Sequence, residues 1–358
     1  DRRGTALGIW GVAAMAGPAF GPVIGGYLVT TVSWHWLFLI NVPVGCIAIT
    51  AAVRLLRETG YRDNRRFDSV GLGLATVGLV LCLPGLAQAS EWGWGSTSTL
   101  GLLGAGAVVL TLFVRWEQHV PHPAVDVAMF RVPIFSLTLV VIGMATIVQY
   151  GILVFLPLTL ETVRGWTALH VGVVLVPTAI GGAITFPLGG RLTDRIGPRV
   201  PVISGLALLA TSAIMLGRLS VDSPTWVIVV ALFAQGLGFG FSMMPNSVVG
   251  LNALPGRFVA QATAVRQLNV RVSAAFGIAV LGTLLAHRLP AAEVTGPDHP
   301  AAAAAQNAYG DIFTIAAGIA VVGLVLATRL PGRARNRELQ LERAAEGDAA
   351  ALEMADTA

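Results

Sequence analysis

Polar side chains inside otherwise apolar stretches are the residues of this sequence best suited to bind a small molecule or carry a proton. Burying such a group in an apolar segment is costly unless it faces the interior of a helix bundle, so each is a candidate for a substrate or proton path. The candidates are Gln149, Tyr150, Glu161, Gln235, Asn246, Gln267, Asn269 and Arg271.

Several of these candidates also have purely structural interpretations. Gln235 and Asn246 flank a glycine-rich stretch, where hydrogen bonds between helices explain them equally well. Arg271 can snorkel or form a pair at the inner end of its helix. Glu161 follows Pro157 and can be a solvated carboxylate at the end of a helix rather than a titrating group. The sequence leaves both interpretations open.

Motifs for enzymes and metal sites are missing from the sequence. It has no GxxxxGK[ST] phosphate loop, no HExxH and no GxSxG, so neither ATP-driven chemistry nor hydrolysis has support. His119 and His122 lie close together, but Pro121 breaks the helix that would align them as a metal pair. We therefore expect neither an enzyme nor a metal or cofactor site.

Long apolar segments must position the polar candidates. The chain of 358 residues is 55% hydrophobic and 12% charged, whereas soluble proteins are about a quarter charged. Many segments approach or exceed the ~18 apolar residues of a membrane-spanning helix, which predicts an all-α polytopic membrane helical bundle with about ten transmembrane helices. We expect the segment 288–308 and the tail 331–358 to be poorly ordered, apart from a short surface helix over 337–345. The expected spans are 7–30, 36–53, 69–89, 99–115, 134–160, 169–189, 200–217, 225–250, 264–286 and 311–330.

The arginines indicate how these spans are oriented. All 23 basic residues are Arg, and alternate loops divide them 18 to 3, with Arg266 and Arg271 left within a span. Because cytoplasmic loops of membrane proteins carry the excess of positive charge, both ends of this chain are predicted to be cytoplasmic, in the inner (plasma) membrane. The basic isoelectric point of about 9.7 then reflects topology, and we expect no nucleic-acid partner.

The first apolar segment carries a regular pattern of small residues, G-x8-G-x3-G-P-x2-G-G. Its members are Gly8, Gly17, Gly21, Pro22, Gly25 and Gly26. Gly17, Gly21 and Gly25 share one helical face, where the missing side chains allow another helix to approach closely. Pro22 favours a bend. A generic packing face is the simpler interpretation, but the full pattern resembles the antiporter signature in the fifth span of drug:proton antiporters of the major facilitator superfamily. In that superfamily the signature is associated with export.

A second motif joins two of the expected spans on the arginine-rich side, over residues 190–199. Its functional residues would be Gly190, Asp194, Arg195, Gly197 and Arg199. It resembles the superfamily's G-x-L-x-D-x-x-G-R loop, although Pro198 stands where a basic residue is usual. We expect Gly190 and Gly197 to form a tight turn between helices. The resemblance implies that Asp194 docks near residues 2–8 as a cytoplasmic gate, and pairing with arginines of its own loop is the alternative.

The centre of the sequence resembles one branch of this superfamily. Segments 69–89 and 99–115 look like the two extra central spans of the fourteen-span EmrB/QacA-type branch, and residues 38–45 are similar to its sixth span. The resemblance implies that the first four spans are lacking. The expected division is 1–57 for the last two spans of an N-terminal half, 58–118 for a cytoplasmic loop and the extra spans, 119–330 for a six-span C-terminal half, and 331–358 for a cytoplasmic tail.

The resemblance implies a secondary active transporter that exports drugs or other hydrophobic or cationic small molecules in exchange for protons. Its partners would be a small-molecule substrate, protons and the lipid bilayer, with no cofactor. The alternative is a truncated remnant or interaction subunit that does not transport, because the lacking spans would supply half of the cavity wall. The substrate, the residue that carries the proton and the oligomeric state do not follow from the sequence.

Overall fold

The computed structural model of the chain describes residues 21, 23–55, 68–121, 123–289, 294, 296–338 and 341–342. Over these residues the regular secondary structure is helical, without a β-strand. Nine helices in the described part of the chain are long and apolar enough to cross a membrane. They confirm nine of the expected spans, and the remaining one, 7–30, lies mostly outside the described residues.

The helices that can span a membrane follow one another along the chain with short connections. The first combines α2 (Trp36–Leu39) and α3 (Asn41–Leu55). The others are α4 (Ser69–Ala87), α6 (Thr97–Glu117), α7 (Pro133–Thr162), α8 (Ala168–Ile196), α9 (Arg199–Gly217), α10 (Thr225–Asn252), α11 (Val259–Ala286) and α12 (Ala302–Ala327). Shorter elements are α5 (Ala89–Trp92) and the 3₁₀ turns η1 (Val127–Arg131) and η2 (Gly256–Phe258).

Local sequence signals determine where several of these helices begin. The Ser96 hydroxyl accepts a hydrogen bond from the Thr99 N–H at 3.2 Å and caps α6. The Thr167 hydroxyl accepts from the His170 N–H at 3.3 Å and caps α8. Such caps satisfy amide groups that have no partner within the first turn of a helix.

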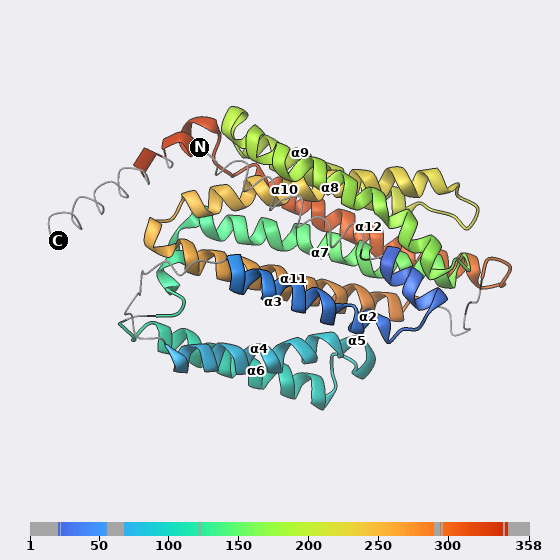
Figure 1. Cartoon of the computed structure of the whole chain (residues 1–358), viewed down its shortest axis with the longest axis horizontal. Coiled ribbons are helices and arrows are strands. Elements are labelled where there is room, and N and C mark those ends of the chain that lie inside the picture. Colours follow the sequence, from blue (N-terminus) through green and yellow to red (C-terminus); the bar gives the residue numbers. More distant parts are fainter. Residues whose placement is uncertain are drawn as a thin grey trace.

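Helices α7 to α12 pack into one bundle (Figure 1). Within it, α7 contacts each of the other five helices. Its side chains Ile152, Leu156 and Leu160 are fully buried in the largest apolar cluster, together with Leu206 of α9 and Phe313 of α12. A helix with neighbours on several sides needs apolar residues on most of its faces, and this explains the long, mainly apolar run of α7.

Glycines allow α10 to lie very close to α8 and α9. A β-carbon added at Gly205 of α9 would lie 2.6 Å from the backbone nitrogen of Ser242. One added at Gly181 of α8 would lie 2.7 Å from the backbone nitrogen of Leu237. Real β-carbons do not approach backbone atoms so closely, so both contacts require the absence of a side chain. Helix association in lipid depends on such close packing.

Helices α4 and α6 form a separate pair that lies against α11 (Figure 1). Gly78 faces the Leu110 side chain and Gly106 faces Cys82, so small residues again permit the close approach. Beyond α5, the Trp94 indole N–H donates a hydrogen bond of 2.7 Å to the Thr283 hydroxyl of α11. This bond fastens one end of the pair to the six-helix bundle.

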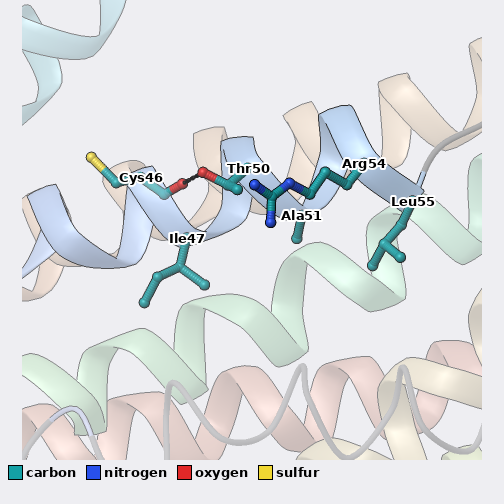
Figure 2. A pocket seen from close by; sticks show the side chains of 6 residues that line it. All are labelled: Cys46, Ile47, Thr50, Ala51, Arg54 and Leu55. Atoms are coloured by element: carbon teal, nitrogen blue, oxygen red, sulfur yellow. Dashed lines mark hydrogen bonds between the residues drawn. The ribbon is translucent and has the colours of Figure 1, made fainter.

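α3 is apolar along its length but buries none of its residues. Figure 2 shows one side of it, where Cys46, Ile47, Thr50, Ala51, Arg54 and Leu55 line an open hollow of ≈ 460 Å³. The Thr50 hydroxyl donates to the Cys46 carbonyl at 2.8 Å, so its polar group is satisfied within the helix. The described residues therefore leave α3 without the tight packing that α7 to α12 share.

The expectation of poor order is wrong for the second part of 288–308. α12 begins at Ala302, and Ala305 and Gln306 are buried within it. Alanine has the highest helix propensity, and its small side chain allows close packing against α9. The Ala-rich composition therefore marks the first two turns of a buried helix.

The beginning of the tail also differs from the expectation. Residues 333–338 are helical, and Pro331 and Asn336 are buried. This segment lies against the turn between α8 and α9, because a β-carbon added at Gly197 would lie 2.7 Å from the Arg333 backbone nitrogen. Most of the later tail lies outside the described residues.

We predict that Gly205→Ala destabilises the bundle by about 1–3 kcal/mol, because the added methyl group must displace backbone atoms of α10. The matched control is Gly318→Ala in α12, where an added β-carbon meets nothing within 4 Å. The control should be neutral or stabilise by about 0.5–1 kcal/mol through helix propensity. Thermal unfolding in detergent measures both. Equal melting temperatures for the two variants would contradict the close contact of α9 with α10.

Candidate functional site

A cavity of ≈ 280 Å³ lies among α7, α8 and α10. It brings together three of the residues predicted to line a path: Gln149 and Tyr150 of α7 and Gln235 of α10. The rest of the lining comes from the same three helices: Leu153, Leu175, Thr178, Ala179, Gly182, Phe186, Gly236 and Phe239. We take this cavity as the candidate functional site.

Hydrogen bonds to both neighbouring helices hold the Gln235 carboxamide in place. The Thr178 hydroxyl of α8 donates to Gln235 Oε1 at 3.3 Å, and Gln235 Nε2 donates to the Gln149 backbone carbonyl of α7 at 3.5 Å. Gln149 Oε1 is buried and accepts no hydrogen bond from the described residues. A buried acceptor without a donor is costly, so the cavity wall offers this oxygen to a bound molecule or water.

Apolar groups make up most of the wall. The rings of Phe186 and Phe239 meet edge to face with centroids 6.4 Å apart. Gly236 has no space for a side chain, because an added β-carbon would collide with the Thr178 carbonyl. The described lining therefore contains aromatic and aliphatic surface, two amides, a hydroxyl and a phenol, but no charged group. Such a wall suits an uncharged apolar molecule that makes a few hydrogen bonds.

The two predicted asparagines lie outside this cavity and connect helices. Asn246 of α10 is fully buried, and its Nδ2 donates to the Thr138 carbonyl of α7 at 3.1 Å. Asn269 of α11 donates in the same way to the Leu139 carbonyl at 2.9 Å. Both amides thus join a neighbouring helix to the α7 backbone, which is the structural interpretation that the sequence left open for Asn246.

The predicted charged residues also lie away from the cavity lining. Glu161 is exposed in the last turn of α7, and Arg271 is exposed on α11 beside Gln267, one turn earlier. No ion pair to Glu161 or Arg271 is present among the described residues. The guanidinium of α11 that is partly buried is instead that of Arg266, which donates to the Ser247 hydroxyl of α10 at 3.0 Å.

Only one of the two glycines expected to form the turn of the 190–199 motif lies in a turn. α8 continues to Ile196, so Gly190 and Asp194 lie within its last turns, and a β-carbon at Gly190 would meet nothing within 4 Å. Gly197 alone makes the turn, with φ +84°, a conformation that other residues adopt only with strain. The prediction was therefore correct for Gly197 and wrong for Gly190.

Asp194 is exposed, and no described arginine lies within ion-pair distance of it. Pairing with Arg191, Arg195 or Arg199 of its own loop is thus not observed. The expected partner segment, residues 2–8, lies outside the described residues, so the docking of Asp194 stays a prediction.

Of the antiporter pattern, Gly21, Gly25 and Gly26 are described, whereas Gly8, Gly17 and Pro22 lie outside the described residues. The close approach was expected along Gly21 and Gly25, but it occurs at Gly26. A β-carbon at Gly26 would lie 2.6 Å from the Ala168 carbonyl oxygen at the start of α8, whereas one at Gly21 would meet nothing within 4 Å. The helical residues 23–31 therefore contact α8 through a different face from the one predicted.

Arg164 stabilises the loop beside this contact. Its two terminal nitrogens donate to the carbonyls of Ser223 and Ser220 at 2.9 and 2.8 Å, and its guanidinium lies over the Trp166 ring, 5.5 Å from the centroid. Burial lowers the pKa of Arg164, and the nearby Asp222 carboxylate partly opposes that effect. The α7–α8 loop is thereby held against the α9–α10 loop, next to the Gly26 contact.

Comparisons with known proteins agree with this architecture. The family model described as Major Facilitator Superfamily matches residues 1–278 and again residues 138–352. The chain belongs to the Major Facilitator Superfamily. Helices α8 to α12 pack against α7, and a polar and aromatic cavity lies among α7, α8 and α10. This is thus the bundle of a multi-pass membrane protein of the superfamily.

Several curated superfamily members with named roles are similar to this chain. It is 30% identical over 315 residues to the lincomycin resistance protein LmrB of Listeria monocytogenes, covering 86% of this chain and 67% of the relative. It is 30% identical to the multidrug resistance protein Stp of Mycobacterium tuberculosis, covering 81% and 54%. It is 34% identical to the tetracenomycin C resistance and export protein of Streptomyces glaucescens, covering 79% and 53%. The chain thus spans between half and two thirds of the length of these relatives.

Sequence reasoning identified Gln149, Tyr150 and Gln235 of the cavity but not Thr178, Phe186 and Phe239. Phe186 and Phe239 lie in apolar runs where any phenylalanine is expected, and Thr178 resembles the other threonines that bond to their own helix. The only sequence feature near these three residues is that Thr178 and Phe186 follow Pro177, and that Phe239 lies among the glycines of α10. Such spacing occurs in packed cores as well as beside cavities, so it does not predict a cavity.

We predict that Asn246→Leu lowers the stability of the bundle by about 0.5–2 kcal/mol, because it removes the hydrogen bond from α10 to α7. Gln267→Leu, on the exposed face of α11, is the control and should change stability by less than about 0.5 kcal/mol. Unfolding in increasing detergent denaturant, followed by tryptophan fluorescence, measures both variants. A control as unstable as Asn246→Leu would show that the asparagine does not connect the helices.

Proposed function

We propose that this chain acts in the proton-coupled export of uncharged, hydrophobic small molecules by alternating access. The observation that carries the proposal is the α7–α8–α10 cavity, in which Gln149, Gln235 and Thr178 are set among aromatic side chains. Membership of the Major Facilitator Superfamily and the resistance and export named for three relatives support it. Because the sequence has no nucleotide-binding loop, we propose that an ion gradient supplies the energy. The proton is proposed as the coupling ion because the glycine pattern of the first span resembles the signature of drug:proton antiporters.

The lining favours uncharged over cationic substrates. A cation transferred from water into an apolar cavity is best stabilised by a carboxylate, because aromatic faces such as those of Tyr150, Phe186 and Phe239 replace only a small part of its hydration. The described lining has no carboxylate, whereas its amides and hydroxyl can bond to carbonyl, hydroxyl or amide groups of a neutral molecule. Among the hydrophobic and cationic substrates expected from the sequence, the neutral apolar ones fit better.

Alternating access requires two groups of helices to move as units relative to each other. The glycine contacts of α10 with α8 and α9 make the six-helix bundle tightly packed, as one such unit should be. The contact of Gly26 with Ala168 joins residues 23–31 to this bundle at one end. We propose that this contact forms and breaks during transport, and that both chain ends face the cytoplasm.

The second candidate function is that of a membrane remnant or interaction subunit without transport. The observation in its favour is that α3 buries none of its residues. An apolar helix that lacks close partners would be completed by other helices. A transport measurement separates the two functions.

The test uses the purified chain reconstituted into liposomes with a pH gradient and a neutral, hydrophobic fluorescent dye. Transport predicts that the dye accumulates against its gradient and that a protonophore abolishes the accumulation. We expect Gln149→Leu to weaken dye binding about tenfold, because the hydrogen bond that its unpaired Oε1 accepts from the dye, worth about 1.4 kcal/mol, is lost. Gln267→Leu should transport normally. Dye distribution identical to that of empty liposomes would support the remnant instead.

A further prediction concerns the Gly26 contact. Gly26→Val should reduce dye transport strongly, because the added side chain would collide with the Ala168 carbonyl. Keeping residues 23–31 against α8 would then require backbone shifts that cost about 1–3 kcal/mol. Gly21→Val should retain transport, because the space around Gly21 is open. Initial rates in the same liposomes measure the difference. A larger loss in Gly21→Val than in Gly26→Val would show that the predicted stripe, not Gly26, makes the essential contact.

A further inference from the structure

Two carboxylates meet at one end of the α4–α6 pair, remote from the cavity. Asp68 caps α4, and its Oδ1 accepts hydrogen bonds from the Gly71 N–H at 2.8 Å and from the Trp116 indole N–H at 3.2 Å. Its other oxygen, Oδ2, is buried and has no donor among the described residues. Half of this carboxylate is therefore satisfied and half is not.

Glu117, the last residue of α6, shows the same asymmetry more strongly. Only 3% of the residue is exposed. Its Oε2 accepts a hydrogen bond from the Val125 N–H at 3.2 Å, whereas its Oε1 is buried and has no donor in the described part of the chain. A buried carboxylate with an unpaired oxygen is costly, so a missing partner is implied.

The two unpaired oxygens border the same space. A β-carbon added at Gly71 would lie 2.6 Å from Glu117 Oε1 and would also collide with Asp68 Oδ2. Glu117 further lines a cavity of ≈ 310 Å³ that opens between α6 and η1. With both groups ionised, two negative oxygens would face each other at low dielectric, and their repulsion would have no compensation.

The other charges that the structure describes around this corner do not supply the missing donor. Asp126 borders the cavity and is itself negative, and its carboxylate accepts from the Ala128 N–H. Arg131 of η1 lines the cavity, yet it makes no ion pair with either carboxylate. His119 bonds through its ring to the Arg115 backbone carbonyl, and Arg115 itself is exposed and forms no ion pair with either carboxylate.

α11 adds no charge here. Its Gln261 bonds to Asp126 and Pro123, Arg266 bonds to Ser247, and Arg271 lies about 15 Å further along the helix from Gln261.

We propose that Asp68 and Glu117 bind one proton between them and form a proton site outside the transport cavity. The proton on one carboxyl group turns an unpaired oxygen into a donor for the other, and this satisfies both oxygens at once. A metal ion fits less well, because no group of three histidine, cysteine or acidic ligands exists in the described part of the chain.

The site connects the α4–α6 pair to the six-helix bundle. Glu117 holds Val125, the next residue Asp126 donates its N–H to Gln261 Oε1 of α11 at 3.1 Å, and Gln261 Nε2 donates to the Pro123 carbonyl at 2.9 Å. Loss of the proton restores the repulsion and pushes Glu117 away from Asp68. The position of the segment 123–126 between the two helix groups thus depends on protonation.

The experiment measures the thermal stability of the purified chain in detergent between about pH 5 and about pH 9, where free carboxyl groups are ionised. If the folded chain holds a proton that the unfolded chain releases, the melting temperature must fall as the pH rises. Glu117→Gln replaces the proton-bearing group with a neutral amide that still donates to Asp68 and accepts from Val125. It should remove this fall, and Asp68→Asn should do the same. Glu161→Gln, the same change at an exposed carboxylate of α7, is the matched control and should keep the wild-type slope.

Infrared difference spectra of the same samples provide the direct readout. The wild-type chain should show the C=O band of a protonated carboxyl group near neutral pH, and Glu117→Gln should lose it. A wild-type slope in both Glu117→Gln and Asp68→Asn, with the band unchanged, would overturn the proposal. Stabilisation of the wild type at high pH by sodium or calcium, absent in Glu117→Gln, would also overturn it, because a metal ion would then be the occupant.

Discussion

The structure depends on the approach of α10 to α8 and α9 at backbone distance. Lipid tails are as apolar as the helix surfaces, so helices in a membrane gain little from burying apolar area and associate through close packing and hydrogen bonds. Gly181 and Gly236 at one interface of α10, and Gly205 and Gly238 at the other, remove the side chains that would prevent this packing. α10 is thereby fixed from two sides, and its remaining face is directed toward α7.

The cavity follows from this constraint. With Gly236 against the Thr178 carbonyl, the preceding residue Gln235 comes within hydrogen-bond distance of both Thr178 and the α7 backbone. The amide is thus positioned by the contact that closes the α8–α10 interface. A molecule that enters among Phe186, Phe239 and Gln149 would touch all three helices beside the close α8–α10 contact. This links occupancy of the cavity to the arrangement of the bundle, as alternating access requires.

Much of this fold could be predicted from the sequence, because the need for about 20 apolar residues per span is strong and local. Helix contacts were harder to predict, since they depend on which face of each helix meets a neighbour. The glycine pattern correctly indicated a close approach in the first span, but the contact is made at Gly26 instead of Gly21. Gln149 and Gln235 were predicted for the site because amides are rare in spans, whereas Phe186 and Phe239 carry no such signal. The division of the chain at 57, 118 and 330 stays a prediction.

The most direct test of the account is whether a substrate occupies the α7–α8–α10 cavity. Leu153 lines it and is 39% exposed, and Leu158, also on α7 but outside the lining, is 41% exposed. Cys46 and Cys82 are first replaced by alanine. A single cysteine is then introduced at position 153 or at position 158, and its labelling with a maleimide is measured in liposomes. The account predicts that the neutral dye slows labelling of Leu153→Cys and leaves that of Leu158→Cys unchanged. Equal protection of both positions, or of neither, would contradict it.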